Sequence, residues 1–535
     1  MLRSRRGFAA LVAASASLLL LTGCVLLPPA LPSPGQPSGS SGSSGSPSGP
    51  GSVSAPVWSP TGEDVPADLA PYYGQSVDWQ GCGSNWCGMV TAPMDWYGSV
   101  DDDIEVSVVV APATGDRLGA ILYNPGGPGA SGADYVQQFA DFLVAPEVRE
   151  RYDLVGFDPR GVGGSTPISC YDDPKELYDW LWELPPSPAP EPLSDEDLQL
   201  QLEDAQWFAD SCLENTGPFL EFVGTEQVAS DMDLIRALLG EEKLGYLGVS
   251  YGTLIGSTYA DLFPENVGRM VLDAAVAPDA TDDEGTLFQA SGFELAYGNF
   301  VDDCLQQRGC PFTGSRDEAM QQTAALLDAL DDDPIEVADG RGLGSGALFV
   351  AIAANLYSDA QWSTLRTVLA DVMAGRGESA FAQADAYYGV RPDGTFADNS
   401  LEALIAVNCL DAPAVTDFDQ VRANAQEIMA AAPTLGPDFV GLSSCAAWPF
   451  EATREPHAIT APGADPIIVI GGLNDPATPY QQSVELAAML ESGVLISVDA
   501  EGHSQYNGVN RNRCVDEPVN EYFLTGVAPT ADLTC

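Results

Sequence analysis

The residue with the clearest chemical potential is Ser250, which stands in the pentapeptide Gly248-Val249-Ser250-Tyr251-Gly252. An apolar run precedes this segment and a helical pattern follows it. A Gly-x-Ser-x-Gly sequence between a strand and a helix is typical of a sharp turn that raises the serine above the end of a sheet. The glycines stand where larger side chains would clash with neighbouring backbone. Ser250 is therefore the candidate nucleophile for acyl transfer.

A serine hydroxyl needs a base to remove its proton, and histidine most often fills that role. The chain of 535 residues has only two histidines. His503 follows an expected strand and is the candidate base, whereas His457 has no strand before it and is interpreted as structural. Asp475 lies between Ser250 and His503 in chain order and also follows an apolar run, where an orienting carboxylate is expected. The sequence therefore predicts a triad of Ser250, His503 and Asp475.

Acyl transfer also requires N–H donors for the negative oxygen of the tetrahedral intermediate. The segment Asn124-Pro125-Gly126-Gly127-Pro128-Gly129 follows an early apolar run, where backbone N–H groups can point toward the serine. We expect the amide of Gly127, or that of Gly126, to act together with the amide of Tyr251, the residue after the nucleophile.

Strands that alternate with helices must position these residues. The expected strands are residues 104–110, 120–123, 152–158, 244–248, 269–272, 466–470 and 493–498, and a helix is expected over 253–263. Short apolar runs that end in Gly/Pro-rich turns and alternate with helical patterns indicate a mostly parallel sheet with helices on both faces, the α/β class. In such sheets the chemistry collects at the carboxyl ends of the strands.

The strand rhythm stops between about residues 276 and 460, where the patterns are mostly helical. The simplest interpretation is one sheet with a helical insertion. The core then consists of residues 57–275 and 461–535, and its first part carries a smaller acidic insertion at about residues 170–220.

Together these features resemble the secreted tripeptidyl aminopeptidases, a serine-peptidase branch of the α/β-hydrolases related to proline iminopeptidases. The matching segments are the loop 124–129, the Asp-Pro-Arg-Gly-Val-Gly turn at 158–163, the pentapeptide with Thr253, Asp475 with Thr478-Pro479, and Gly502-His503. The resemblance covers about residues 78–535. It implies an α/β-hydrolase fold with a mainly helical cap over residues 276–460, and the release of short peptides, tripeptides above all, from N-termini.

The chain departs from the iminopeptidases at Asn124-Pro125, where they carry a histidine before Gly-Gly-Pro-Gly. Release of short peptides is therefore favoured over restriction to N-terminal proline. The resemblance also implies that acidic side chains of the cap capture the free α-amine of the substrate, because a partly desolvated amine needs a carboxylate partner. Glu294 and Asp411 are the candidates for this role.

Two other functions fit the same pattern. Fold and triad alone do not choose the bond that is cleaved, so an ester hydrolase of the carboxylesterase or lipase type is an alternative. A non-catalytic binding lipoprotein that inherited the fold is another, and it predicts a decayed triad. The presence of Ser250, Asp475 and His503 in order favours an enzyme.

The N-terminus predicts export and lipid attachment. Three arginines among the first six residues precede an apolar stretch from about Phe8 to Leu21, which has the charge and length of a signal peptide. Leu21-Thr22-Gly23-Cys24 resembles the bacterial lipoprotein cleavage box, which implies cleavage after residue 23 and lipid on Cys24. Residues 24–56 are rich in Pro, Ser and Gly and predict a flexible tether. We expect a protein anchored by lipid on the outer face of the cell membrane. A form of the protein released from the membrane is the other possibility that the sequence leaves open.

The net charge limits the kinds of partner that are expected, and the cysteine content indicates disulfides. The formal net charge of −56 argues against nucleic acid as a partner, and peptides with a free N-terminus are the expected substrates. No metal or cofactor is expected. Ten cysteines remain after Cys24, and in an exported protein they predict disulfides. Sequence leaves their connectivity open, and pairing between neighbours along the chain is our hypothesis. These residues are Cys82, Cys87, Cys170, Cys212, Cys304, Cys310, Cys409, Cys445, Cys514 and Cys535.

Overall fold

The computed structural model of the chain describes residues 58–182, 193–508 and 511–535. The predicted signal peptide, Cys24 and the tether of residues 24–56 lie outside these described residues. Within them, no helix has both the length and the apolar character needed to cross a membrane.

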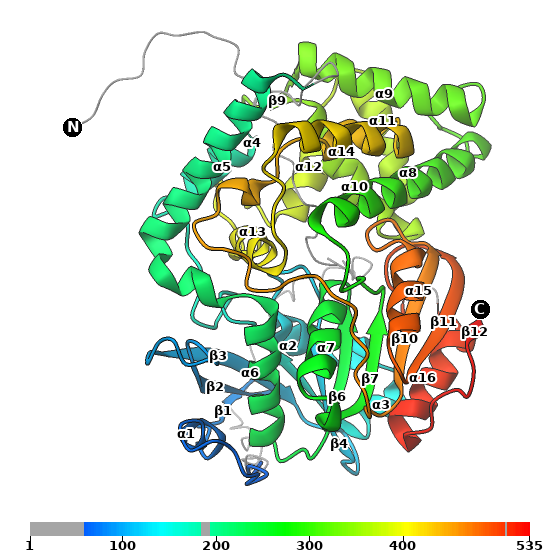
Figure 1. The fold of residues 1–535 in the computed structure, drawn as a ribbon. Coiled ribbons are helices and arrows are strands. Elements are labelled where there is room, and N and C mark those ends of the chain that lie inside the picture. Colours follow the sequence, from blue (N-terminus) through cyan, green and yellow to red (C-terminus); the bar gives the residue numbers. More distant parts are fainter. Residues whose placement is uncertain (1–57, 183–192, 509–510) are drawn as a thin grey trace, which may run out of the picture.

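A ten-stranded sheet forms the centre of the molecule (Figure 1). Its strands lie in the order β1-β2-β3-β5-β4-β6-β7-β10-β11-β12. From β5 to β12 all neighbouring strands are parallel, whereas the pairs β1-β2, β2-β3 and β3-β5 are antiparallel. The strands are β1 (Gln80–Cys82), β2 (Asn85–Pro93), β3 (Asp103–Ala111), β4 (Gly119–Asn124), β5 (Tyr152–Phe157), β6 (Leu244–Val249), β7 (Val267–Asp273), β10 (Ile467–Asn474), β11 (Gly493–Glu501) and β12 (Leu533–Thr534).

Helices cover both faces of this sheet (Figure 1). One face packs against α2 (Gly132–Leu143), α3 (Pro146–Arg149) and α16 (Arg513–Thr525). The other packs against α6 (Thr225–Leu238), α7 (Tyr251–Leu262) and α15 (Tyr480–Met489). A parallel strand covered on both faces reads as a continuous apolar run, and all six residues of β4 and of β5 are buried. The predicted α/β class, a mostly parallel sheet with helices on both faces, is confirmed.

The segment between β7 and β10 forms a mainly helical cap beyond the carboxyl ends of the central strands (Figure 1). Its longer helices are α8 (Asp282–Gln306), α9 (Arg316–Asp332), α10 (Ser345–Leu356), α11 (Trp362–Met373), α12 (Glu378–Tyr387), α13 (Ser400–Asp411) and α14 (Phe418–Ala431). It also contains short 3-10 turns, η3 (Asp359–Gln361), η4 (Gly436–Phe439) and η5 (Ser444–Ala447), and one small antiparallel pair, β8 (Ile335–Glu336) and β9 (Gly342–Leu343).

The smaller insertion lies against this cap and extends it. It contains α4 (Pro174–Trp182), α5 (Asp195–Thr216) and the 3-10 turn η1 (Gly217–Phe222). The backbone N–H of Leu442 in the cap donates to the Gln201 side chain of α5 at 2.6 Å, and Arg422 of α14 pairs with Asp195. These contacting residues lie 241 and 227 positions apart in sequence. The two insertions therefore form one layer, which the sequence patterns did not reveal.

Five disulfides join the ten cysteines of the described chain, each to its neighbour in sequence, as hypothesised. The pairs are Cys82–Cys87, Cys170–Cys212, Cys304–Cys310, Cys409–Cys445 and Cys514–Cys535. Two of them stabilise the cap layer directly. Cys170–Cys212 joins the start of the smaller insertion to its helix α5, and Cys409–Cys445 joins α13 to η5.

Candidate active site

Ser250 occupies the turn between β6 and α7, with φ 58° and ψ −128°. A side chain rarely adopts this backbone conformation, so the surrounding structure must hold it in place. The flanking glycines make that possible: a Cβ on Gly248 would lie 2.4 Å from the carbonyl oxygen of Gly252, and one on Gly252 would lie 2.7 Å from that of Asn124. The strand–turn–helix context predicted for Ser250 is present, at the carboxyl end of a central strand.

His503 and Asp475 form a buried hydrogen-bonded pair at this same edge. The Nδ1 atom of His503 lies 2.8 and 2.9 Å from the two carboxylate oxygens of Asp475. The residues are 4% and 1% exposed. Asp475 follows β10 and also accepts the backbone N–H groups of Ala477 and Thr478, at 3.0 Å each. The structure thus brings together the histidine and the carboxylate that the sequence singled out.

The cap contacts this histidine directly. The backbone N–H of His503 donates to the carbonyl oxygen of Tyr357 at 2.9 Å, and the two rings meet edge to face with centroids 5.3 Å apart. Tyr357 follows α10 of the cap. On the opposite side, a Cβ on Gly129 would lie 2.3 Å from the carbonyl oxygen of Ser400, the first residue of α13. The cap therefore rests on both the histidine loop and the glycine loop of the site.

The glycine loop packs against the serine turn. Gly126 and Gly127 have φ values of 98° and 113°, and a Cβ on Gly126 would lie 2.8 Å from the Cβ of Ser250. The amide of Gly126 donates to the Asn124 side chain at 2.9 Å. Its role as an oxyanion donor stays a prediction, and this contact favours Gly127 over it. Among the described residues, the amides of Gly127 and Tyr251 have no hydrogen-bond acceptor, as a pair awaiting an oxyanion requires.

His457 lies away from this edge. Its Nε2 is 3.1 Å from Asp261 near the end of α7, and its Nδ1 is 2.8 Å from the carbonyl oxygen of Glu455. These two contacts raise its pKa. Ser250 precedes the first residue of α7, so about 16 Å of helix separate it from Asp261. The structural interpretation of His457 agrees with this position.

The two carboxylates considered for the substrate amine have partners within the protein. Glu294 of α8 accepts the backbone N–H groups of Thr434 and Leu435, at 3.0–3.2 Å. Asp411, at the end of α13, accepts the backbone N–H of Thr225 at 2.9 Å and its hydroxyl at 2.5 Å. Both contacts stabilise the cap. Amine binding by Glu294 or Asp411 stays a prediction, and these contacts do not favour it.

The Asp411 contact continues to the serine turn. The hydroxyls of Thr225 and Tyr251 are 2.5 Å apart, so a chain of hydrogen bonds runs from the cap carboxylate through the first residue of α6 to the residue after Ser250. Burial raises the pKa of Asp411, and its bonds to Thr225 act in the opposite direction. Thr225 was missed because nothing in its local sequence marks it: its partners lie 26 and 186 positions away.

Three further residues support the site, and the sequence patterns did not predict this role for them. The hydroxyl of Thr478 donates to Asp475 at 3.3 Å. Asn399, just before α13, accepts the amide of Gly163 and donates to the carbonyl oxygens of Gly161 and Ile168. Asp273 is the last residue of β7 and is 1% exposed. An acidic residue at the end of an apolar run was the available signal for Asp273.

These residues together have the parts of a serine hydrolase site. A serine stands on a strained turn at the carboxyl end of β6, and a buried histidine is oriented by a carboxylate. Of the two amides without an acceptor, one belongs to the residue after the serine and the other to the glycine loop packed against the serine turn. Such a set supports nucleophilic attack on an acyl carbon, with the histidine as base and the amides as oxyanion donors.

Comparison with known proteins agrees with this chemistry. A serine protease named Hip1 from Mycobacterium tuberculosis is 37% identical over 490 residues, which cover 87% of this chain and 92% of that protein. The tripeptidyl aminopeptidase of Streptomyces lividans is 33% identical over 478 residues, 86% of each chain. The chain belongs to the tripeptidyl aminopeptidase family of α/β-hydrolase serine peptidases. Residues 432–535 also match the family model described as TAP-like protein.

Membership of the tripeptidyl aminopeptidase family makes the protein a serine hydrolase, as the sequence predicted. The family's relatives do not all carry peptidase names, however. A Mycobacterium tuberculosis protein named carboxylesterase B is 34% identical over 460 residues, which cover 84% of this chain and 86% of that protein.

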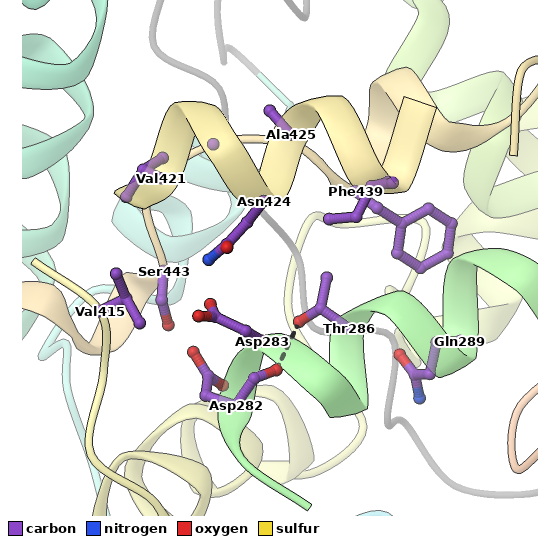
Figure 2. A pocket seen from close by; sticks show the side chains of 12 residues that line it. Asp282, Asp283, Thr286, Gln289, Val415, Val421, Asn424, Ala425, Phe439 and Ser443 are labelled. Atoms are coloured by element: carbon purple, nitrogen blue, oxygen red, sulfur yellow. Dashed lines mark hydrogen bonds between the residues drawn. The ribbon is translucent and has the colours of Figure 1, made fainter. Parts of the chain in front are cut away.

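The cap layer also contains a pocket with acidic side chains, which lies between α8 and α14 (Figure 2). Asp282 and Asp283, at the start of α8, project into it beside Asn424 and Ser443. None of Ser250, Asp475 and His503 is among the residues that line it. Burial of the Asp282 carboxyl, with the neighbouring charge of Asp283, raises its pKa from 3.8 to about 7.

This raised pKa predicts how Asp282 affects stability. Because the folded-state pKa lies above the unfolded value, folding is progressively penalised as the pH rises from about 4 to about 7, and the penalty is complete above that range. We expect Asp282→Asn to raise Tm by about 1–2 °C at pH 8 relative to the wild type, with the difference vanishing near pH 4. Thermal unfolding followed by circular dichroism across this range measures the effect.

The matched control is Asp317→Asn, which removes an exposed carboxyl from the first turn of α9. Both substitutions remove a charge that favours a helix N-terminus, so only the burial differs between them. A Tm difference for Asp282→Asn that does not grow with pH would contradict the assignment.

Proposed function

We propose that the protein is an extracytoplasmic exopeptidase that releases short peptides, tripeptides above all, from free N-termini. Ser250, His503 and Asp475 are its catalytic residues. The observation that carries this proposal is the buried His503–Asp475 pair at the same sheet edge as the strained Ser250 turn, beneath a cap that contacts the histidine loop.

The reaction proceeds through an acyl-enzyme. The Oγ of Ser250 attacks the scissile carbonyl carbon while its proton moves to Nε2 of His503, and Asp475 stabilises the resulting imidazolium. The negative oxygen of the tetrahedral intermediate accepts hydrogen bonds from the backbone N–H groups of Gly127 and Tyr251. When the C–N bond breaks, His503 donates the proton to the leaving amine. Water then attacks the ester carbon and gives a proton to His503. His503 passes this proton to the Oγ of Ser250 as the acyl–oxygen bond breaks, and the N-terminal peptide leaves with a new carboxylate.

The cap supports action at chain ends. The two insertions form one layer beyond the strand ends, and its elements contact the loops on both sides of Ser250. A site covered in this way favours a short substrate end over the middle of a folded chain. The printed name of the Streptomyces lividans relative supports tripeptides as the released unit.

The cell surface is the proposed location. The predicted signal peptide and the lipid on Cys24 would hold the enzyme at the outer face of the membrane, and five disulfides suit an oxidising exterior. Incorporation of a labelled fatty acid, lost in Cys24→Ser, tests the anchor.

A peptide set offered with free and with N-acetylated termini tests the exopeptidase proposal. We expect mass spectrometry to show tripeptides cut successively from the free N-termini, and acetylation to suppress cleavage by on the order of 100-fold or more, because the amine then loses its charge-assisted contact. Equal cleavage of both sets, or cuts within the peptides, would contradict the proposal.

Ester hydrolysis is the second candidate, favoured by the relative named carboxylesterase B. The same triad can cleave an amide or an ester bond, so the relative rates on the two kinds of substrate distinguish the two candidate functions. Comparing kcat/KM for tripeptidyl amides with that for short acyl esters separates them, and a higher value for esters that carry no amine would favour the second candidate.

A further inference from the structure

We infer that Asp273 is a positioning residue of this active site, which holds the loop of His503 in register with the turn of Ser250. This inference rests on the proposed peptidase mechanism and adds a second carboxylate to it. Asp273 ends β7, the strand between β6, which leads to Ser250, and β10, which leads to Asp475. No lysine or arginine among the described residues forms an ion pair with it, although it is 1% exposed.

The contacts of Asp273 join two parts of the site. Its carboxylate accepts the backbone N–H of Gln505 at 2.9–3.0 Å and that of Tyr506 at 2.8 Å, two and three positions after His503. Its own carbonyl oxygen accepts the backbone N–H of Ser250 at 3.0 Å. One buried residue therefore contacts both the nucleophile turn and the base loop, which lie about 250 positions apart in sequence.

The backbone at these contacts is held in conformations that side chains seldom adopt. Ser250, Ala274 and Ser504 have φ values of 58°, 62° and 64°. The N–H of Ser250 donates to Asp273, Ala274 follows Asp273 in the chain, and Ser504 precedes Gln505, whose N–H donates to Asp273. Such conformations persist only where surrounding contacts over-determine them, and they concentrate at functional sites. The Asp273 contacts supply that constraint.

The division of work between the two carboxylates follows from their partners. Asp475 bonds the ring of His503, whereas Asp273 bonds the backbone of the loop that carries the ring. The N–H groups of Gln505 and Tyr506 both donate to one oxygen of Asp273, and the N–H of Gln505 also lies 3.0 Å from the other. An asparagine that keeps the shared oxygen would therefore set its own N–H₂ group against the N–H of Gln505. The loop would then shift, and with it the distance between His503 and Ser250.

Charge adds a measurable consequence. Burial raises the pKa of Asp273 to about 6, and the N–H groups of Tyr506 and Gln505 and the nearby His503 oppose that rise. Because His503 lowers the pKa of Asp273, Asp273 must by reciprocity favour the imidazolium of His503. Asp475 also faces Asp273, and its negative charge raises the pKa of Asp273.

The test compares wild type, Asp273→Asn and a control, Asp153→Asn, with tripeptidyl amides as substrate. Asp153 is also a buried carboxylate that accepts a backbone N–H, but it lies near the amino end of β5. For Asp273→Asn we expect kcat to fall on the order of 10- to 100-fold, KM to stay within about twofold, and the acid limb of the pH profile to move to lower pH. For Asp153→Asn we expect lower Tm with kcat and the pH profile unchanged.

A folded Asp273→Asn protein with wild-type kcat and an unmoved acid limb would overturn the inference. An inactive wild type would instead count against the proposed function, so the two failures are distinguishable. If Asp273→Asn does not fold, hydrogen exchange of the wild-type loop 502–508 replaces it. We expect the protection factors of Gln505 and Tyr506 to fall as the pH drops through about 6, and constant protection would overturn the inference.

Discussion

Replacing Ser250 with alanine should lower peptidase activity by about 10⁴- to 10⁶-fold, to the level left by substrate binding and the oxyanion donors alone. The substitution removes the Oγ nucleophile and keeps the Cβ that packs against Gly126, so we expect the fold and Tm to change little. Steady-state kinetics on tripeptidyl amides, with labelling by a fluorophosphonate probe, measures the loss. The wild type should label once per chain and the variant not at all.

Ser257→Ala is the control for this prediction. Ser257 lies in the same helix, α7, is buried, and donates its hydroxyl to the carbonyl oxygen of Leu254 at 3.1 Å. It should keep full activity and full labelling. Residual activity in Ser250→Ala above about 1% of wild type, or labelling that survives the change, would show that another residue is the nucleophile.

Replacing Asp475 with asparagine should lower kcat by about 10⁴-fold. Asparagine keeps an oxygen for the amides of Ala477 and Thr478, so the loop after β10 retains its shape. It removes the negative charge beside Nδ1 of His503, and its N–H₂ group favours the tautomer in which Nε2 carries the proton. The histidine can then no longer accept the proton of Ser250. The kcat of the purified variant and its rate of fluorophosphonate labelling should fall together.

Asp465→Asn provides the matched change on the same part of the chain. Asp465 precedes β10 and forms an exposed ion pair with Lys243 at 2.7 Å. Exposed pairs contribute little, so we expect kcat within about twofold of wild type. If Asp475→Asn kept more than about a tenth of wild-type kcat, Asp475 would not be the carboxylate that orients His503.

Much of the core could be predicted because its strands are covered on both faces. The runs at 120–123, 152–158 and 244–248 correspond to β4, β5 and β6, whose residues are almost all buried. β1, β2 and β12 were not predicted. β2 alternates irregularly, with Cys87 and Gly88 in its interior, and Gly88 leaves room for the side chains of Val77 and Trp79. β1 and β12 are short edge strands and β2 lies next to an edge, and none of the three has a continuous apolar run.

The candidate site divides in the same way. Local patterns led to Ser250, Asp475 and His503, because a turn between a strand and a helix, or the end of an apolar run, is visible in a few adjacent residues. Asp273 and Thr225 could not be found so directly. Their partners lie 232 and 186 positions away, and with 77 acidic residues in the chain no local feature shows which carboxylates are buried.

By itself, therefore, the sequence determined the α/β core, the order of the candidate nucleophile, carboxylate and base, and the presence of ten cysteines beyond Cys24. The tertiary structure decided which groups around them are engaged. It assigned the amide of Gly126 to Asn124, occupied Glu294 and Asp411 with backbone amides, and placed Asp273 between two loops. The reason is that strands and turns depend on neighbouring residues, whereas a buried polar group takes whatever partner long-range packing brings to it.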